Sequence, residues 1–101
     1  MNREDISDIA YAINWQVSLD KNKKVIGVQL YNVMDMSQVS KNEWPIFVDF
    51  KPSDLFIQRA KKQIEKLDWS NNKKGDMEAS AHSYLFHSDP DNPVSSNDNT
   101  R

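Results

Sequence analysis

The chain has 101 residues, the length of one small domain with a single hydrophobic core. Thirteen basic and fifteen acidic residues leave a net charge of −2, so the overall charge indicates neither a nucleic-acid nor a membrane partner. The sequence contains no cysteine, which excludes disulfides, thiolate nucleophiles and Cys-ligated metal centres. No apolar run approaches the ~18 residues of a membrane-spanning helix. Residues 1–8 are acidic and unlike a signal peptide, so we expect a cytoplasmic protein.

The first twenty residues combine two periodicities. Ile6, Ile9 and Ile13 recur at helical spacing, whereas residues 11–19 alternate in the manner of a half-buried strand. Because β-branched and aromatic side chains favour strands, the sequence predicts a short helix over residues 3–10 followed by a strand. A single helix running through residue 19 is the alternative.

Two further strands are expected after this one. A polar turn over residues 20–24 leads to a second strand over residues 25–33, so the first two strands form a hairpin. Pro45 then precedes a third strand over residues 46–50, a position that proline tolerates. The residues expected to point inward are Ile26, Val28 and Leu30 in the second strand and Ile46, Val48 and Phe50 in the third.

The clearest helix spans residues 54–69, with Ser53 as its N-cap. Its apolar stripe consists of Phe56 or Ile57, Ala60, Ile64 and Leu67. Residues 76–87 fit either a helix or a short edge strand, and the spacing of their apolar side chains favours the helix. These elements predict an α+β fold of order α-β-β-β-α-α, a three-stranded antiparallel sheet with helices packed on one face.

The folded domain is expected to cover residues 1–87. The remaining residues, 88–101, contain one aliphatic side chain, two prolines and many Ser, Asn and Asp. Such a segment buries too little apolar surface to offset the entropy lost on ordering. The composition therefore predicts a disordered polar tail.

No motif for catalysis or for a cofactor is present. His82 and His87 are five residues apart, a spacing that does not bring them together on one face of a helix or strand. With two glycines in the chain, neither a nucleophile elbow nor a phosphate-binding loop is evident. We expect no metal, no cofactor and no enzymatic activity.

The predicted strands place a group of large apolar side chains on the sheet face that the helices leave uncovered. Either the last helix or the N-terminus covers this patch, or a patch of this size on a small protein indicates a contact with a partner or a second copy. The expected protein-binding residues are Tyr31, Val33, Trp44 and Phe47. We call the sheet face opposite the helix the outer face.

A basic segment supports a second hypothesis. Residues 21–74 hold eleven basic and six acidic residues, whereas both flanks are acidic. The candidate phosphate-binding residues are Arg59, Lys61, Lys62, Lys66, Lys73 and Lys74. A solvated helix face is the alternative interpretation of the same charges.

Together these features favour a small non-catalytic binding module that docks on, and inhibits or regulates, a larger protein or nucleoprotein. Short Cys-free chains without catalytic motifs are common among inhibitors, immunity proteins and phage-encoded antagonists, anti-CRISPR proteins included. Direct nucleic-acid binding through the basic segment is the second hypothesis. A homo-oligomer, such as a homodimer pairing through the outer face, is the third. Nothing in the sequence suggests a membrane partner.

Overall fold

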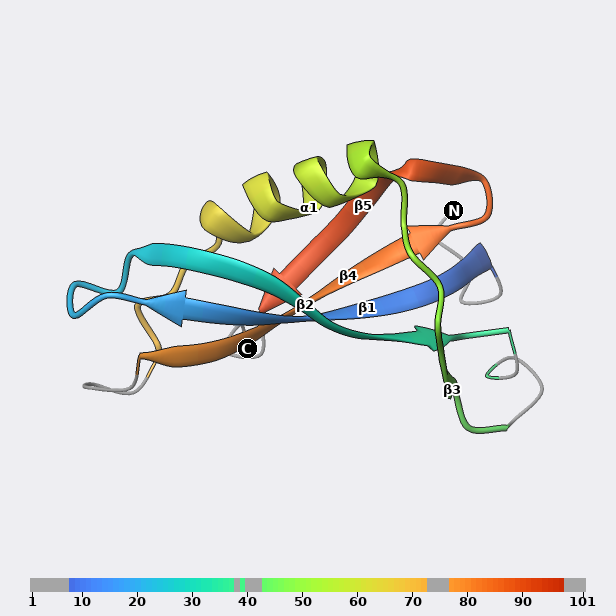
Figure 1. Cartoon of the computed structure of the whole chain (residues 1–101), viewed down its shortest axis with the longest axis horizontal. Helices are drawn as coiled ribbons and strands as arrows, with labels where there is room; N and C mark the ends of the chain where they lie inside the picture. The colour runs from blue at the N-terminus through green and yellow to red at the C-terminus, as the bar shows by residue number, and fades with distance from the viewer. Residues whose placement is uncertain (1–7, 38, 40–42, 73–76, 98–101) are drawn as a thin grey trace, which may run out of the picture.

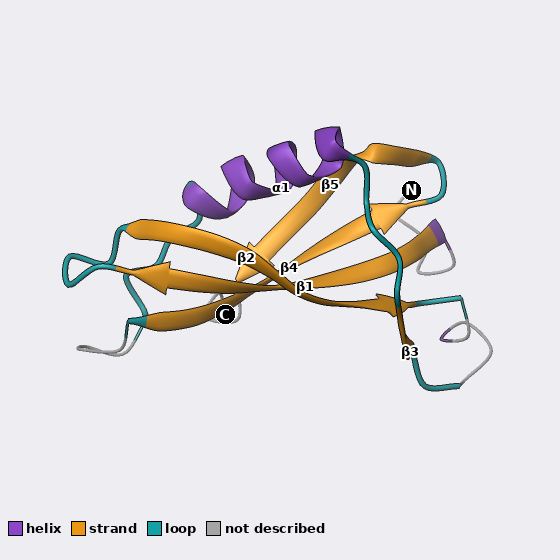
Figure 2. Cartoon of the chain, viewed as in Figure 1, coloured by secondary structure: helices purple, strands orange, loops and turns teal. Residues whose placement is uncertain are grey.

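A computed structural model describes residues 8–37, 39, 43–72 and 77–97. Its element order is β1 (Ile9–Leu19), β2 (Val25–Asp35), β3 (Ile46–Val48), α1 (Asp54–Glu65), β4 (Glu78–Phe86) and β5 (Asp89–Asn97). The strands form one antiparallel sheet in the order β3-β2-β1-β4-β5, and α1 lies over one face of it (Figures 1 and 2). The chain is therefore mostly sheet, and the prediction of a three-stranded sheet covered by several helices is wrong.

The central strand β1 confirms the alternation seen in the sequence. Ile13, Trp15, Val17 and Leu19 are buried on the face toward α1, whereas Gln16 and Ser18 are exposed on the other face. A helix through residue 19 is thereby ruled out. Of the helix expected over residues 3–10, the last two residues belong to β1, and residues 3–7 lie outside the described residues.

The predicted hairpin between β1 and β2 is present. The carboxylate of Asp20 closes the turn, since its Oδ1 accepts hydrogen bonds from the main-chain N–H groups of Asn22 (2.8 Å) and Lys24 (2.9 Å). Lys23 adopts a left-handed conformation with φ of 65°, and its ammonium group donates to the carbonyl of Ser70 at 2.9 Å. The turn is thus tied to the segment that follows α1.

Two β-bulges in β2 change which of its residues point inward. The pairing with β1 shifts register between Ser18 and Leu19 and again between Asn14 and Trp15, which leaves Ile26 and Tyr31 as the extra residues of β2. Ile26 is consequently exposed instead of inward. Val33 is 2% exposed and belongs to the core, so its expected place on the outer face is wrong.

Helix α1 begins where the sequence predicts it. The Ser53 hydroxyl accepts a hydrogen bond from the N–H of Phe56 at 3.1 Å, and the helix ends at Glu65, four residues earlier than expected. Phe56, Ala60 and Ile64 are buried against the sheet. Beyond the helix, the indole N–H of Trp69 donates to the carbonyl of Ile64 at 3.1 Å, which folds the chain back onto the core.

The segment expected to be a last helix is strand β4, which pairs with β1 along most of its length. In β4 the buried residues Ala81, Ser83 and Leu85 alternate with the less buried His82 and Tyr84, the period of a strand. Because β1 is central and buried, its second edge needs a hydrogen-bonding partner, and β4 supplies it. The hydrogen bonds that β4 forms with β1 therefore outweigh the weak helical pattern of this segment. That pattern consists of Met77, Ala81, Tyr84 and Leu85.

The expected disordered tail is also wrong for residues 89–97, which form β5, while residues 98–101 lie outside the described residues. Polar hydrogen bonds compensate for the small apolar content of this strand. The hydroxyls of Ser83 and Ser95 are 2.8 Å apart, and Asn97 Nδ2 donates to the carbonyl of Asp68 at 2.8 Å. A composition argument that counts only apolar burial therefore underestimates the order of this segment.

Candidate functional site

The outer face carries an apolar row that crosses all five strands. The strand register places these residues opposite one another, in the order Phe47, Met34, Ala12, Tyr84 and Val94. Phe47 and Val94, at the two ends of the row, are 66% and 53% exposed. Ala12 in the middle is buried, as expected of a small side chain between two large ones.

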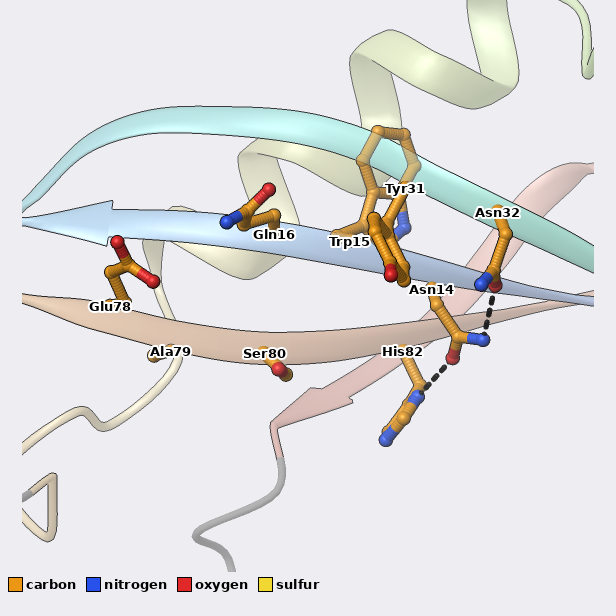
Figure 3. Close-up of a pocket in the computed structure, with 9 residues that line it drawn as sticks. All are labelled: Asn14, Trp15, Gln16, Tyr31, Asn32, Glu78, Ala79, Ser80 and His82. Atoms are coloured by element: carbon orange, nitrogen blue, oxygen red, sulfur yellow. Dashed lines mark hydrogen bonds between the residues drawn. The ribbon is translucent and has the colours of Figure 1, made fainter.

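A polar row runs beside the apolar one. It consists of Asn32, Asn14, His82 and Ser96, on β2, β1, β4 and β5 respectively. Asn14 Nδ2 donates to Asn32 Oδ1 at 2.6 Å, and Asn14 Oδ1 lies 2.7 Å from His82 Nδ1 (Figure 3). Because that amide oxygen can only accept, the imidazole carries a proton on Nδ1. The row thereby fixes the orientation of three side chains from three strands.

An open depression of about 490 Å³ lies over the polar row. Figure 3 shows the residues around it, among which Tyr31 provides an exposed aromatic ring beside the buried Trp15. The hydrogen-bonding side chains around it are those of Asn14, Gln16, Asn32, Ser80 and His82. Glu78 is the one carboxylate among the described residues that line it. These described groups can form hydrogen bonds with a neutral polar surface.

Of the four residues proposed from the sequence for protein binding, the structure exposes three and buries one. Tyr31 is 70% exposed at its bulge, and Phe47 projects from β3 at the end of the apolar row. Trp44, just before β3, is 88% exposed. Val33 is buried and pairs with Val48 on the core side, so it has no part in an exposed patch.

Four of the residues proposed for nucleic-acid binding are described, and they lie on the other side of the molecule, in α1 and at the position directly after it. Lys61, Lys62 and Lys66 are exposed. Arg59 instead holds β5, where its guanidinium donates to the carbonyl of Asp91 at 3.2 Å and to the amide oxygen of Asn92. Lys73 and Lys74 lie outside the described residues. Among the six basic residues, Lys61, Lys62 and Lys66 therefore remain candidates for nucleic-acid binding that are both described and exposed.

Neither histidine belongs to a metal centre within the described part of the chain, where no group of three or more His, Cys, Asp or Glu side chains is placed to hold an ion. His82 is part of the polar row, and the main-chain N–H of His87 donates to the carbonyl of Asp8 at 2.8 Å. The carboxyl with a perturbed pKa nearest the apolar row is that of Asp35. Hydrogen bonds from the main chain and side chain of Ser37 lower this pKa, which is a turn-stabilising arrangement.

Sequence reasoning missed the polar row. The polar alternation of Asn14, Gln16 and Ser18 is visible in the sequence, but their partners depend on the register of β2 and on the existence of β4. Asn32 faces Asn14 only because the Tyr31 bulge adds one residue to β2. A run of Asn and Gln at alternate strand positions is the signal that could have indicated such a face.

Comparisons with known proteins add no relative: no protein-family model matches the chain, and no similar chain is found among curated proteins or solved structures. Across the residues that the structure describes, no helix has the length and apolar character required to cross a membrane.

Proposed function

We propose that this protein is a small non-catalytic binding module that docks on a larger protein through its outer face. The observation that carries the proposal is the apolar row of five residues across the whole sheet, with Phe47 and Val94 largely exposed at its ends. Exposed aromatic side chains next to orientated amides are typical of protein interfaces. Docking would occlude a surface of the larger partner in the cytoplasm, as inhibitors, immunity proteins and phage-encoded antagonists do.

The distribution of charge supports a protein partner. Among the described residues of the two rows and the depression, Glu78 and His82 are the titratable groups besides two tyrosines. By contrast, α1 and its C-cap Lys66 present four basic side chains, those of Arg59, Lys61, Lys62 and Lys66, and two carboxylates. A nearly uncharged interface is held by apolar burial and short hydrogen bonds. Its affinity should therefore depend little on salt.

The exposed lysines of α1 favour a second candidate, binding to nucleic acid. They lie on one helix face, but Glu65 is exposed among them. Binding through these lysines would weaken steeply with salt, because each phosphate contact releases counterions. Salt dependence thus distinguishes the two candidates.

The test is affinity capture of partners from lysate by the tagged protein and two double variants, with and without nuclease, at low and moderate salt. Tyr31→Ala with Phe47→Ala removes the two exposed aromatics, and Lys61→Ala with Lys62→Ala is the matched control on α1. We expect a stoichiometric protein that survives salt and nuclease, is retained by the lysine variant, and is bound about 30-fold more weakly by the aromatic variant. Capture unaffected by the aromatic double variant, with its circular dichroism unchanged, would refute the proposal.

Loss of binding in the lysine variant, or recovery of nucleic acid that disappears with salt, would establish the second candidate instead.

A further inference from the structure

The exposed ring of Tyr31 lies next to two polar rows of the outer face. The β-bulge inserts Tyr31 into β2 directly before Asn32, the first residue of the polar row described above, and its side chain is 70% exposed. A second row crosses the sheet two residues further along β1. We call it the glutamine row, and it consists of the exposed residues Gln29, Gln16 and Ser80, on β2, β1 and β4. Tyr31 is thus bordered by hydrogen-bonding side chains on both sides along β2.

The two rows contain four amide side chains, those of Asn14, Asn32, Gln16 and Gln29. Each amide offers N–H donors and a carbonyl acceptor side by side. The hydrogen bond from Asn14 Nδ2 to Asn32 Oδ1, at 2.6 Å, uses one of the two N–H groups of Asn14 and leaves the amide nitrogen of Asn32 turned away from Asn14. The orientation of these two amides is therefore fixed in the unliganded protein, which reduces the entropy that a ligand would lose for them on binding.

The distance between the two rows suits a single sugar ring. Asn14 and Gln16 are two residues apart in β1, which separates their Cα atoms by about 6.4–6.8 Å. Hydroxyl groups on opposite sides of a hexose ring have a similar separation. In the view of Figure 3, the ring of Tyr31 lies between the side chains of Gln16 and Asn14. A sugar ring resting on Tyr31 therefore brings its hydroxyls within reach of both rows.

The charge of the depression favours a neutral ligand. Lysine and arginine are absent from the described residues that line it, and Glu78 contributes a carboxylate. A ligand with a phosphate group would find no permanent cation in this lining and would be repelled by Glu78. The volume of about 490 Å³ lies within the range of small-molecule sites.

We propose that this depression binds a neutral, soluble oligosaccharide, with one sugar ring stacked on Tyr31. The C–H groups on one face of a sugar ring carry partial positive charge, and the face of an aromatic ring is its negative side. The hydroxyls around the edge of the same sugar both donate and accept hydrogen bonds, as the amides of the two rows do. Because the depression is open, neighbouring sugar units can continue past the first one.

A nucleobase is the competing ligand, since it also stacks on tyrosine and forms hydrogen bonds with amides. Nucleic acids, however, owe most of their affinity for proteins to phosphate contacts with lysine and arginine, which the described lining lacks. The saccharide site shares Tyr31 with the docking surface proposed above but includes neither Phe47 nor Val94. Saccharide binding and protein docking can therefore be tested separately.

The test is an NMR titration of the ¹⁵N-labelled protein, in which side-chain amide signals report on the site directly. The probes are cellotriose, maltotriose, mannotriose and galactobiose, with adenosine as the competitor. We expect at least one saccharide to shift the amide signals of Asn14, Asn32 and Gln16, with a Kd of about 0.1–10 mM. The amide of Gln63, which donates to the carbonyl of Pro93 at 2.7 Å on the side of α1, is the internal control and should not shift.

Variants then locate the ligand. Tyr31→Ala should weaken binding at least about tenfold, whereas Tyr31→Phe keeps the ring and should retain most of the affinity. Gln16→Ala should weaken binding about threefold or more, because it removes an amide of the glutamine row. Phe47→Ala is the matched control, since Phe47 is an exposed aromatic residue of the same face outside the depression, and the affinity for saccharide should not change.

Three results would each overturn the proposal. The first is the absence of a shift with every saccharide at about 50 mM, where a site of millimolar affinity is filled. The second is equal affinity of Tyr31→Ala and the wild-type protein, or a loss of affinity in Phe47→Ala as large as that in Tyr31→Ala. The third is tighter binding of adenosine than of every saccharide, which would assign the site to a nucleobase. Because Phe47 belongs to the proposed docking surface alone, protein capture by Phe47→Ala separates a failure of docking from a failure of saccharide binding.

Discussion

Trp15 and Ser83 are joined by a buried hydrogen bond between neighbouring strands, in which the indole N–H donates to the serine hydroxyl at 2.8 Å. Trp15 is the largest fully buried side chain of the core, and its N–H would otherwise have no partner there. The hydroxyl of Ser83 lies a further 2.8 Å from that of Ser95 on β5. A short polar chain thus links β1, β4 and β5 inside the apolar core.

The first prediction concerns this series of hydrogen bonds from Trp15 through Ser83 to Ser95. Ser83→Ala leaves the buried indole N–H unsatisfied and should lower the free energy of unfolding by about 1–3 kcal/mol. Urea titration followed by Trp fluorescence measures the effect. Ser80→Ala, exposed on the same strand, is the control and should change the stability by less than about 0.5 kcal/mol. Equal stabilities of the two variants would contradict the structural role of Ser83.

A second prediction concerns the contact of α1 with β5. Gln63→Ala removes the hydrogen bond to the carbonyl of Pro93, so the amides of β5 should exchange faster with solvent while those of β1 stay protected. Hydrogen exchange followed by NMR measures both strands in one experiment. Lys61→Ala, on the exposed side of the helix, is the control. Uniform acceleration in all strands would show that the variant destabilises the whole sheet instead of its edge.

A third prediction tests the start of α1. Ser53→Ala removes the oxygen that accepts from the N–H of Phe56 and should cost about 1 kcal/mol of stability. Ser53→Thr keeps that oxygen and should retain most of the stability of the wild-type protein. Thermal unfolding followed by circular dichroism compares the three proteins. If the threonine variant were as unstable as the alanine variant, the loss would not come from the cap.

The fourth prediction is a pH dependence at the turn after α1. Hydrogen bonds from the side chain and main chain of Ser70 lower the pKa of Asp68 below its ordinary value. A lowered folded-state pKa means that the ionised carboxylate stabilises the fold above its ordinary pKa, and that this contribution is lost as the pH falls through the folded-state pKa. NMR titration should show Asp68 titrating below the ordinary range.

The matched variant for that experiment is Asp68→Asn, which removes the titrating group. Its unfolding midpoint should fall less steeply than that of the wild type as the pH drops below about 4. Parallel curves for the two proteins would contradict the assignment of this pH dependence to Asp68.

Local sequence signals predicted those elements that local chemistry determines. The alternation in β1, the polar turn after it and the Ser53 cap of α1 are all present in the structure, because each depends on residues adjacent in the chain. The apolar stripe of α1 faces the core as expected, with Phe56, Ala60 and Ile64 buried. A periodicity that spans a whole element is a dependable guide.

Errors arose where distant residues decide the outcome. Counting by twos along β2 placed Val33 outside and Ile26 inside, because nothing in the local sequence reveals a bulge that adds one residue. The short apolar spacing of residues 76–87 favoured a helix, whereas the unpaired side of β1 requires a strand there. The polar composition of β5 concealed hydrogen bonds whose partners lie in α1, in β4 and after the helix.

The position of β1 has a consequence for the order of folding. This strand is the first of the described elements but lies at the centre of the sheet, between β2, its immediate neighbour in sequence, and β4, which follows only after β3 and α1. Its pairing with β2 closes a short turn, whereas its pairing with β4 closes a long loop at a larger entropic cost. During synthesis the β1–β2 hairpin can form early, but the other side of β1 stays unpaired until β4, residues 78–86, has left the ribosome. A nascent chain shortened before residue 78 would therefore present the buried central strand β1 with one side bare.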